Sequence, residues 1–165
     1  MLELIQQYWL YFLVGQYPKG PLGGLALTLI LASLGLLLSL PLGLVFGLMR
    51  VSPYRWVRLP VTAFIYIVRG TPLLMVVFWA YFFLPSVTGI KTDQFWTMLI
   101  ALVVFDAAYL AEIVRAGILG LPKGQMECAR SLGLSYMKAM TSVVLPQALR
   151  NSLPSLVNQF ISTIK

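Results

Sequence analysis

The sequence predicts an all-α integral membrane protein, and the prediction follows from its composition and its long apolar segments. Hydrophobic residues make up 59% of the 165 residues and charged residues only 10%, whereas a soluble domain carries about 25% charged residues. The 12 basic and 5 acidic residues are too few to cover a surface that faces water. Several uncharged segments also approach the length of about 20 residues that a helix needs to cross a bilayer. The chain must therefore face membrane lipid.

The residue types that are missing exclude several kinds of chemistry. The chain has no histidine, and Cys128 is its single cysteine. These absences exclude disulfide frameworks, histidine-based metal sites and Cys/His or Ser/His catalysis. We therefore expect no catalytic residue and no metal site. Nucleic-acid binding is not expected either, because the basic residues lie at the edges of apolar segments and form no groove-sized patch.

Residues 1–21 predict a segment that lies at the membrane interface. Glu3 stands where a cleaved signal peptide would have basic residues. Amphipathic aromatic rings settle at the level of the lipid headgroups, and this segment holds Tyr8, Trp9, Tyr11 and Tyr17.

Residues 22–165 predict a transmembrane domain, with full spans over about 22–49, 59–84 and 94–119. A last apolar segment, 154–165, reaches only about 18 Å at 1.5 Å per residue, so we expect the chain to stop inside a fourth span. In the first span, Gly43 and Gly47 form a small-xxx-small pair, which favours close packing against another helix.

The orientation of the spans follows from the basic residues near their ends. Arg50, Arg55 and Arg58 lie in the first linker between spans, and the third linker is also basic. Because basic linkers remain in the cytoplasm, the positive-inside rule places both there and the N-terminus outside.

The polar linker over about 120–153 predicts two short helices on the cytoplasmic face. Residues 125–132 favour a helix, Gly133 ends it, and Ser135 is a suitable N-cap for the next one. We expect Pro146 to redirect the chain after that second helix. Such a unit can dock into a groove of a partner protein, or it can lie passively in the headgroup layer.

Charged residues at membrane depth are costly and need an explanation. Arg69 lies in the second span, and Asp106 and Glu112 lie in the third. An Arg69–Asp106 pair is sterically conceivable, and Glu112 and Arg115, three residues apart on one helix, can satisfy each other. These residues either line a translocation path for a charged or zwitterionic substrate or only pair structurally between helices.

Three uncharged residues near these charges could likewise either line a translocation path or only pack between helices. Tyr109, one turn from Asp106, could offer its hydroxyl to either purpose. Thr71 and Pro72 follow Gly70 inside the second span, where the proline leaves a backbone carbonyl unpaired. A carbonyl at this depth is tolerated only against protein or a water-filled cavity. The segment is therefore either a bend beside a path or a packed kink.

The polar linker contains a motif that resembles the EAA loop of ABC importer permeases. That loop reads Glu-Ala-Ala, three residues, Gly, nine residues and Ile-x-Leu-Pro. Here the matching residues, at the same spacing, are Glu127, Cys128, Ala129, Gly133, Val143, Leu145 and Pro146. Cys128 and Val143 depart from the pattern, and both are small or apolar exchanges. Two further segments, 69–74 and 107–118, resemble the second and third spans of the polar amino-acid (His/Glu/Gln/Arg/opine) branch, which has a MetI-like transmembrane domain.

The resemblance implies a type I ABC importer helix bundle, typically of five spans, in a bacterial inner membrane. It implies that Glu127–Gly133 is the coupling helix that docks onto an ABC ATPase subunit, and that Leu145 and Pro146 complete the motif. The chain has no Gly-x-x-x-x-Gly-Lys-Ser/Thr loop, so ATP and Mg would bind the partner ATPase and this chain would bind no cofactor. A second permease subunit and an extracytoplasmic amino-acid-binding protein would complete the importer.

The function expected from the resemblance is permeation of polar amino acids, with glutamate, aspartate or glutamine favoured. Two alternatives remain. An ion-coupled secondary transporter or channel subunit would use the intramembrane charges as a relay and would need no ATPase. A membrane scaffold would tolerate replacement of Arg69 or Asp106.

Overall fold

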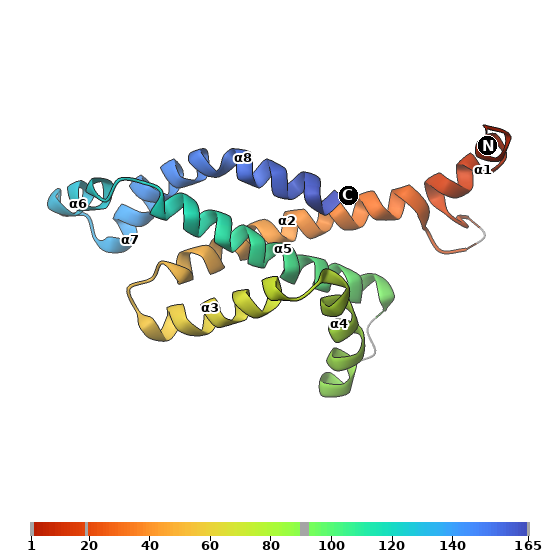
Figure 1. Cartoon of the computed structure of the whole chain (residues 1–165), viewed down its shortest axis with the longest axis horizontal. Helices are drawn as coiled ribbons and strands as arrows, with labels where there is room; N and C mark the ends of the chain where they lie inside the picture. The colour runs from red at the N-terminus through yellow and green to blue at the C-terminus, as the bar shows by residue number, and fades with distance from the viewer. Residues whose placement is uncertain (1, 19, 90–92, 165) are drawn as a thin grey trace.

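The computed structural model describes residues 2–18, 20–89 and 93–164, and nearly all of this part of the chain is helical (Figure 1). An isolated β-bridge joins Gly15 to Leu22. The helices, in chain order, are α1 (Leu2–Val14), α2 (Gly24–Arg50), α3 (Arg55–Gly70), α4 (Leu73–Thr88), α5 (Gln94–Leu119), α6 (Gly124–Ser131), α7 (Tyr136–Ala139), the π-helical turn η1 (Met140–Val144) and α8 (Leu145–Ile164). The interfacial segment expected over 1–21 contains α1.

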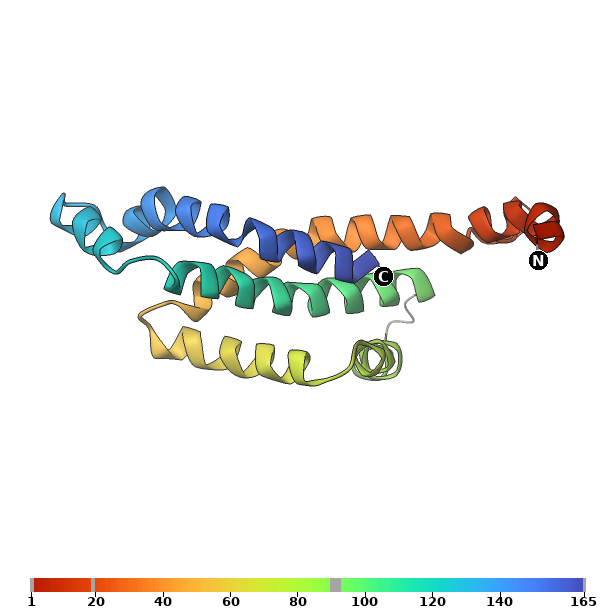
Figure 2. The same cartoon turned by 45° about the horizontal axis from the view of Figure 1, so that its top comes forward.

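Helix α5 is the centre of the bundle. It runs alongside α2, with α8 on one side and α3 on another, while α6 and α7 lie at one end of the molecule and α1 at the opposite end (Figures 1 and 2). One buried cluster joins α5 to η1 and α8; it consists of Val114, Ile118, Met140, Val144 and Ala148. A second cluster joins α5 to α3; it consists of Ile65, Val68, Ala108 and Ala111.

Two glycines bring α2 and α5 into close contact. A Cβ atom built on Gly43 would lie 2.5 Å from the Cβ of Leu110, and one built on Gly47 would lie 2.7 Å from the Cβ of Val114. Both distances are shorter than van der Waals contact allows, so α2 approaches α5 only because these positions lack a side chain. The close packing predicted from the small-xxx-small pair is confirmed.

By length and composition, α2 and α5 are the two helices of the described residues that could each cross a membrane, and α3 with α4 could form a third, broken span. Helix α5 covers the third predicted span. The second predicted span, 59–84, is not one helix: α3 ends at Gly70, α4 begins at Leu73, and the two helices turn through 110°. The expected bend at Gly70–Pro72 is therefore a sharp break. Pro72 causes it, because proline disfavours a helical conformation in the residue before it.

The last helix corrects two expectations. Pro146 does not redirect the chain, because α7, η1 and α8 follow one another without a break and Pro146 is the second residue of α8. The helix also begins at Leu145, well before the expected start at residue 154, and it contains Pro154. In a regular α-helix the ring of Pro146 would crowd the carbonyl one turn earlier. The wider π-turn η1 gives that ring room and lets the helix continue.

Candidate functional site

The loop that carries the EAA-like motif forms a compact helical hairpin at one end of the bundle. In α6 the side chain of Ala129 is buried, whereas Glu127 and Cys128 are exposed. Leu132, just after the helix, is 82% exposed, which is unusual for so large an apolar side chain. Helix α6 therefore buries one small residue and offers most of its polar side chains outward.

Gly133 ends α6 in the way the sequence predicted. Its φ is +83°, a left-handed conformation that favours glycine. The N–H of Gly133 donates to the carbonyl of Arg130 at 3.0 Å, and the N–H of Leu134 donates to the carbonyl of Ala129 at 3.3 Å. These two bonds make a Schellman motif, which satisfies the last carbonyls of the helix. The turn sets the direction of α6 relative to α7.

Helix α7 is capped and tied to α2 at its N-terminal end. Ser135 caps it, accepting a hydrogen bond from the N–H of Lys138 at 3.4 Å, as the sequence predicted. Tyr136 donates its hydroxyl to the carbonyl of Val51 at 3.3 Å, which joins α7 to the end of α2. Burial raises the pKa of the Tyr136 phenol above its ordinary value.

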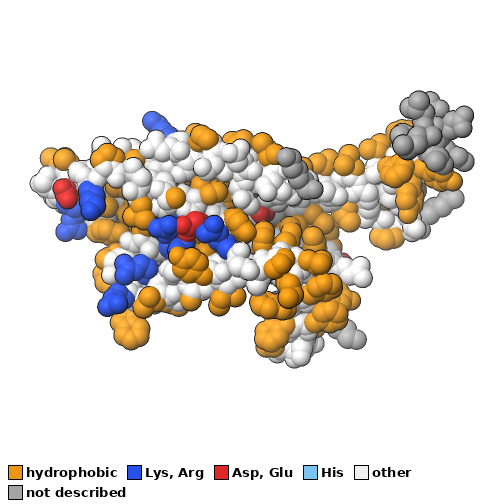
Figure 3. All heavy atoms as spheres, viewed as in Figure 1, with side chains coloured by type: hydrophobic (Ala, Val, Ile, Leu, Met, Phe, Trp, Pro, Cys, Tyr) orange, Lys and Arg blue, Asp and Glu red, His pale blue; other side chains and the backbone are white. Residues whose placement is uncertain are grey.

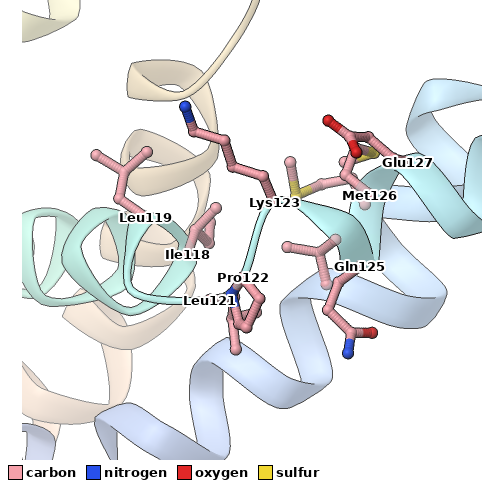
Figure 4. Close-up of a pocket in the computed structure, with 10 residues that line it drawn as sticks. Ile118, Leu119, Leu121, Pro122, Lys123, Gln125, Met126 and Glu127 are labelled. Atoms are coloured by element: carbon pink, nitrogen blue, oxygen red, sulfur yellow. The ribbon is translucent and has the colours of Figure 1, made fainter.

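A cavity of about 330 Å³ lies where α5 passes into α6. Figure 4 shows Glu127, Met126 and Gln125 on one side of it and the last residues of α5 on the other. Met140 and Val144 of η1 also line it. Gln147 of α8 donates to Gln125 at 3.2 Å. The motif residues thus form one unit: α6 packs over η1, and Leu145 and Pro146 lie directly beyond that turn.

Glu112 is the centre of a charge cluster in which three helices meet. It forms an ion pair with Arg50 at the end of α2. Arg115, on the same helix, approaches Glu112 to 2.5 Å, which confirms the predicted pair between them. Arg69 of α3 lies 3.7 Å away. Figure 3 shows this cluster as acidic spheres between basic ones, midway along the visible face.

The Arg69–Asp106 pair, which the sequence allows as sterically conceivable, does not form. Arg69 lies near Glu112 instead, and its guanidinium stands 5.1 Å from the centre of the Tyr109 ring. The face of the Tyr109 ring thus makes a cation–π contact with Arg69. Glu112 is closer than Asp106 to the C-terminal end of α5, and Arg69 meets there the carboxylate that Arg50 and Arg115 already share.

Asp106 joins α5 to α8. Its Oδ1 atom accepts hydrogen bonds from Gln159 at 3.2 Å and from Thr163 at 2.9 Å, and the residue is only 2% exposed. Its Oδ2 atom is buried and has no hydrogen-bond donor among the described residues. Sequence reasoning missed these two partners, although their i, i+4 spacing on an apolar segment was a signal that they share a face.

A second cavity, of about 380 Å³, lies between α5 and α8 and has a partly polar lining. Glu112 contributes to its wall from α5, and Asn151, Ser152 and Ser155 contribute from α8. These three polar residues lie outside the motifs of the sequence. Their grouping around Pro154 was the available signal.

Thr71 and Pro72 lie at the break between α3 and α4. The hydroxyl of Thr71 donates to the carbonyl of Val68 at 2.9 Å and so caps the end of α3. Thr71 also lines an apolar cavity between α3, α4 and α5. Within residues 2–18, 20–89 and 93–164, no three His, Cys, Asp or Glu side chains gather closely enough to hold a metal ion.

Similar proteins are found among curated sequences. The arginine transport system permease protein ArtQ of Bacillus subtilis (strain 168) is 41% identical over 147 residues, covering 87% of this chain and 66% of the relative. The probable glutamine ABC transporter permease protein GlnP of the same organism is 38% identical and covers 86% of this chain and 65% of the relative. The chain thus spans somewhat less than two thirds of the length of both relatives.

Solved structures share the fold. The crystal structure of an amino acid ABC transporter with histidines matches with a TM-score of 0.72 and 38% identity, covering 83% of this chain and 64% of that one. An inward-facing MetNI methionine ABC transporter matches with a TM-score of 0.65, 24% identity and coverage of 85% and 66%. The second match shows the fold alone, which is that of the transmembrane helix bundle of type I ABC importers.

The family model for the inner membrane component of binding-protein-dependent transport systems matches residues 39–165, which include α3 to α8 and the whole EAA-like loop. This match covers most of the chain and agrees with the fold and with the loop geometry described above. The chain belongs to the family of binding-protein-dependent transport system inner membrane components.

Proposed function

We propose that the chain is a membrane permease subunit of an ATP-driven importer of polar amino acids, and that α6 is the element that couples it to a separate ATPase. The observation that carries the proposal is the geometry of α6. It is an exposed helix, closed by a Schellman turn at Gly133 and packed on η1, which continues directly into α8. A push on α6 would therefore reach α8 through one unbroken helix.

The proposed partners follow from this geometry and from the relatives. An ABC ATPase would hold ATP and Mg and receive α6 in a groove. Most of the outward surface of α6 is polar, but Leu132 at its tip offers an apolar side chain that such a groove could bury. A second permease subunit, identical or related, and an extracytoplasmic amino-acid-binding protein would complete the importer.

The proposed orientation places α6 and α7 in the cytoplasm and the N-terminus outside. The linker between α2 and α3 lies at the same end of the bundle as α6 and α7 (Figure 1). Basic residues lie beside both segments, with Arg55 and Arg58 in the first turn of α3 and Lys123 and Lys138 in the later loop. Having both at one end is what the positive-inside rule requires of cytoplasmic segments in a bacterial inner membrane.

We propose that the translocation path runs beside Arg69, Thr71, Pro72, Asp106, Tyr109 and Glu112. The polar cavity between α5 and α8, with Glu112 in its wall, supports this placement. Arg69 is only partly buried, so it can meet an anionic group. The three arginines around Glu112 leave an excess of positive charge, which favours a substrate that carries a carboxylate.

The substrate class is supported by the relatives, whose names include arginine, glutamine and, for the BztC permease protein of Rhodobacter capsulatus, glutamate, glutamine, aspartate and asparagine. Among these we favour glutamate, aspartate and glutamine. Uptake of radiolabelled amino acids by cells expressing the natural transporter, with arginine in the same panel, tests this choice.

The coupling proposal is tested by co-purifying the ATPase with the natural permease from gently solubilised membranes. Gly133→Val should abolish recovery of the ATPase, because a β-branched residue is strained at a φ of +83°. Gly124→Ala is the matched control, because a Cβ there meets nothing within 4 Å and its φ is not left-handed. This variant should recover the ATPase as the unchanged chain does.

Two results would overturn the proposal. The first is recovery of equal amounts of ATPase with Gly133→Val and with the unchanged chain. The second is uptake that stops when the proton gradient is collapsed while ATP is maintained, which is the behaviour of an ion-coupled transporter.

A further inference from the structure

A fourth cavity lies at the proposed cytoplasmic edge of the bundle, between the α2–α3 linker and α7. Its volume is about 260 Å³, and its lining is almost entirely apolar. The residues that line it are Leu48, Met49, Val51, Ser52, Pro53, Tyr54, Val57, Tyr136, Met137 and Met140. The hydrogen bond from Tyr136 to Val51 joins its two walls. No function described above uses this cavity.

Three exposed cations lie next to the cavity along the chain. Arg55, Arg58 and Lys138 each directly follow, in the chain, a residue that lines it, namely Tyr54, Val57 and Met137. The segments 50–58 and 134–146 contain no acidic residue. Arg50, the other cation nearby in the chain, is buried and engaged with Glu112. The exposed charged residues next to the cavity along the chain are therefore all basic, while its lining is apolar.

Aromatic side chains place this cavity at the level of the lipid headgroups. Trp56 is 93% exposed and Tyr54 is 71% exposed, both in the segment that carries Arg55 and Arg58. Exposed Trp and Tyr are enriched where membrane meets water. Figure 3 shows basic spheres next to a projecting hydrophobic side chain over the first turns of α3.

We propose that this cavity is a binding site for an anionic glycerophospholipid. The headgroup phosphate binds Arg55, Arg58 and Lys138, and one acyl chain enters the apolar space between Val57 and Met140. Charge complementarity selects an anionic lipid over a zwitterionic one, because basic groups next to a membrane attract anionic headgroups. The lipid would fill the gap between the α2–α3 linker and α7. The proposal does not depend on the substrate or on the ATPase.

Native mass spectrometry of the purified natural permease, titrated with phosphatidylglycerol or phosphatidylcholine, tests the site. The double variant Arg55→Gln/Arg58→Gln should bind phosphatidylglycerol about thirtyfold more weakly, since each basic residue near an anionic surface contributes about 1 kcal/mol. Binding of phosphatidylcholine should not change. The charge-matched control is Arg130→Gln/Arg150→Gln, which removes two exposed cations of the same loop region that do not follow a cavity residue.

A second variant tests the acyl chain separately from the charge. Val57→Phe narrows the cavity without changing the charge, and it should also weaken phosphatidylglycerol binding. Glycerol 3-phosphate, which has the phosphate and no acyl chain, should not displace the lipid. Equal losses in the test and control double variants would overturn the proposal in favour of diffuse electrostatic attraction. Unchanged binding by Val57→Phe, or displacement by glycerol 3-phosphate, would overturn it in favour of a headgroup site alone.

Discussion

Arg50 and Glu112 form an ion pair that fastens the last residue of α2 to the C-terminal part of α5. The Arg50 side chain is 4% exposed and that of Glu112 is 22% exposed, so most of this pair is removed from solvent. Because Arg69 and Arg115 also approach Glu112, one carboxylate balances cations from three helices. Removing a partner from a buried ion pair is costly, since the remaining charge stays buried without compensation.

Glu112→Gln should therefore destabilise the bundle strongly. The change keeps the shape of the side chain but leaves three arginines facing one another around a neutral amide. We expect a loss of about 3–5 kcal/mol of unfolding free energy, as for other broken buried pairs. This loss of stability is measured by thermal unfolding of the detergent-solubilised protein, monitored by circular dichroism. Glu127→Gln, which neutralises an exposed carboxylate, should change stability little. Equal effects of the two substitutions would contradict the central role of Glu112.

Gly47→Ala should force α2 away from α5. The added methyl group would lie 2.7 Å from two atoms of Val114 and 3.1 Å from the carbonyl oxygen of Ala111. Overpacking of this kind costs about 1–3 kcal/mol, although alanine alone would favour the helix by up to about 1 kcal/mol. We expect a net fall in melting temperature. Gly124→Ala, which meets nothing within 4 Å, should leave the melting temperature unchanged or raise it.

The local features of the EAA-like loop could be predicted from the sequence because they depend on neighbouring residues. Gly133 and Ser135 mark the end of one helix and the start of the next, and the structure has both. The contribution of Pro146 could not be predicted in the same way. A proline usually interrupts a helix, and here the π-turn η1 absorbs it.

The charge pairs could be predicted only where both partners lie on one helix. Glu112 and Arg115 are three residues apart, so their pairing followed from helical geometry. For Arg50 the sequence predicts only a role in membrane orientation, because nothing in it shows that the end of α2 lies against the C-terminal part of α5. The partners of Asp106 likewise come from α8, more than fifty positions along the chain, and depend on how the helices pack.

Thr163→Val should loosen the contact between α8 and α5. The hydroxyl of Thr163 donates to Asp106 at 2.9 Å, and valine keeps the side-chain shape while removing that donor. Loss of a hydrogen bond to a buried acceptor costs about 1–3 kcal/mol. Hydrogen exchange measured by mass spectrometry should show faster exchange of the α8 amides. Thr141→Val is the control, because its hydroxyl donates only to a carbonyl one turn back on its own helical segment and is exposed. Equal protection of α8 in the two variants would argue against the Asp106 contact.

Tyr136→Phe should detach α7 from the end of α2 and change the response of stability to pH. At neutral pH the variant lacks the hydrogen bond to Val51, which should cost about 1 kcal/mol. Burial raises the pKa of Tyr136 in the folded protein above the ordinary value of 10.0. Below pH 10 the phenol is protonated in both the folded and the unfolded chain, so its full contribution to stability is present.

As the pH rises above 10.0, the unfolded chain loses the Tyr136 proton before the folded chain does. The contribution of Tyr136 to the stability of the fold is then lost. Unfolding measured from pH 8 to about 11 should therefore show the difference between the natural chain and Tyr136→Phe shrinking as the pH rises. Tyr54→Phe, at a position that is 71% exposed, should follow the natural chain throughout. A difference in stability that stays constant over this range would show that burial does not raise the pKa of the Tyr136 phenol.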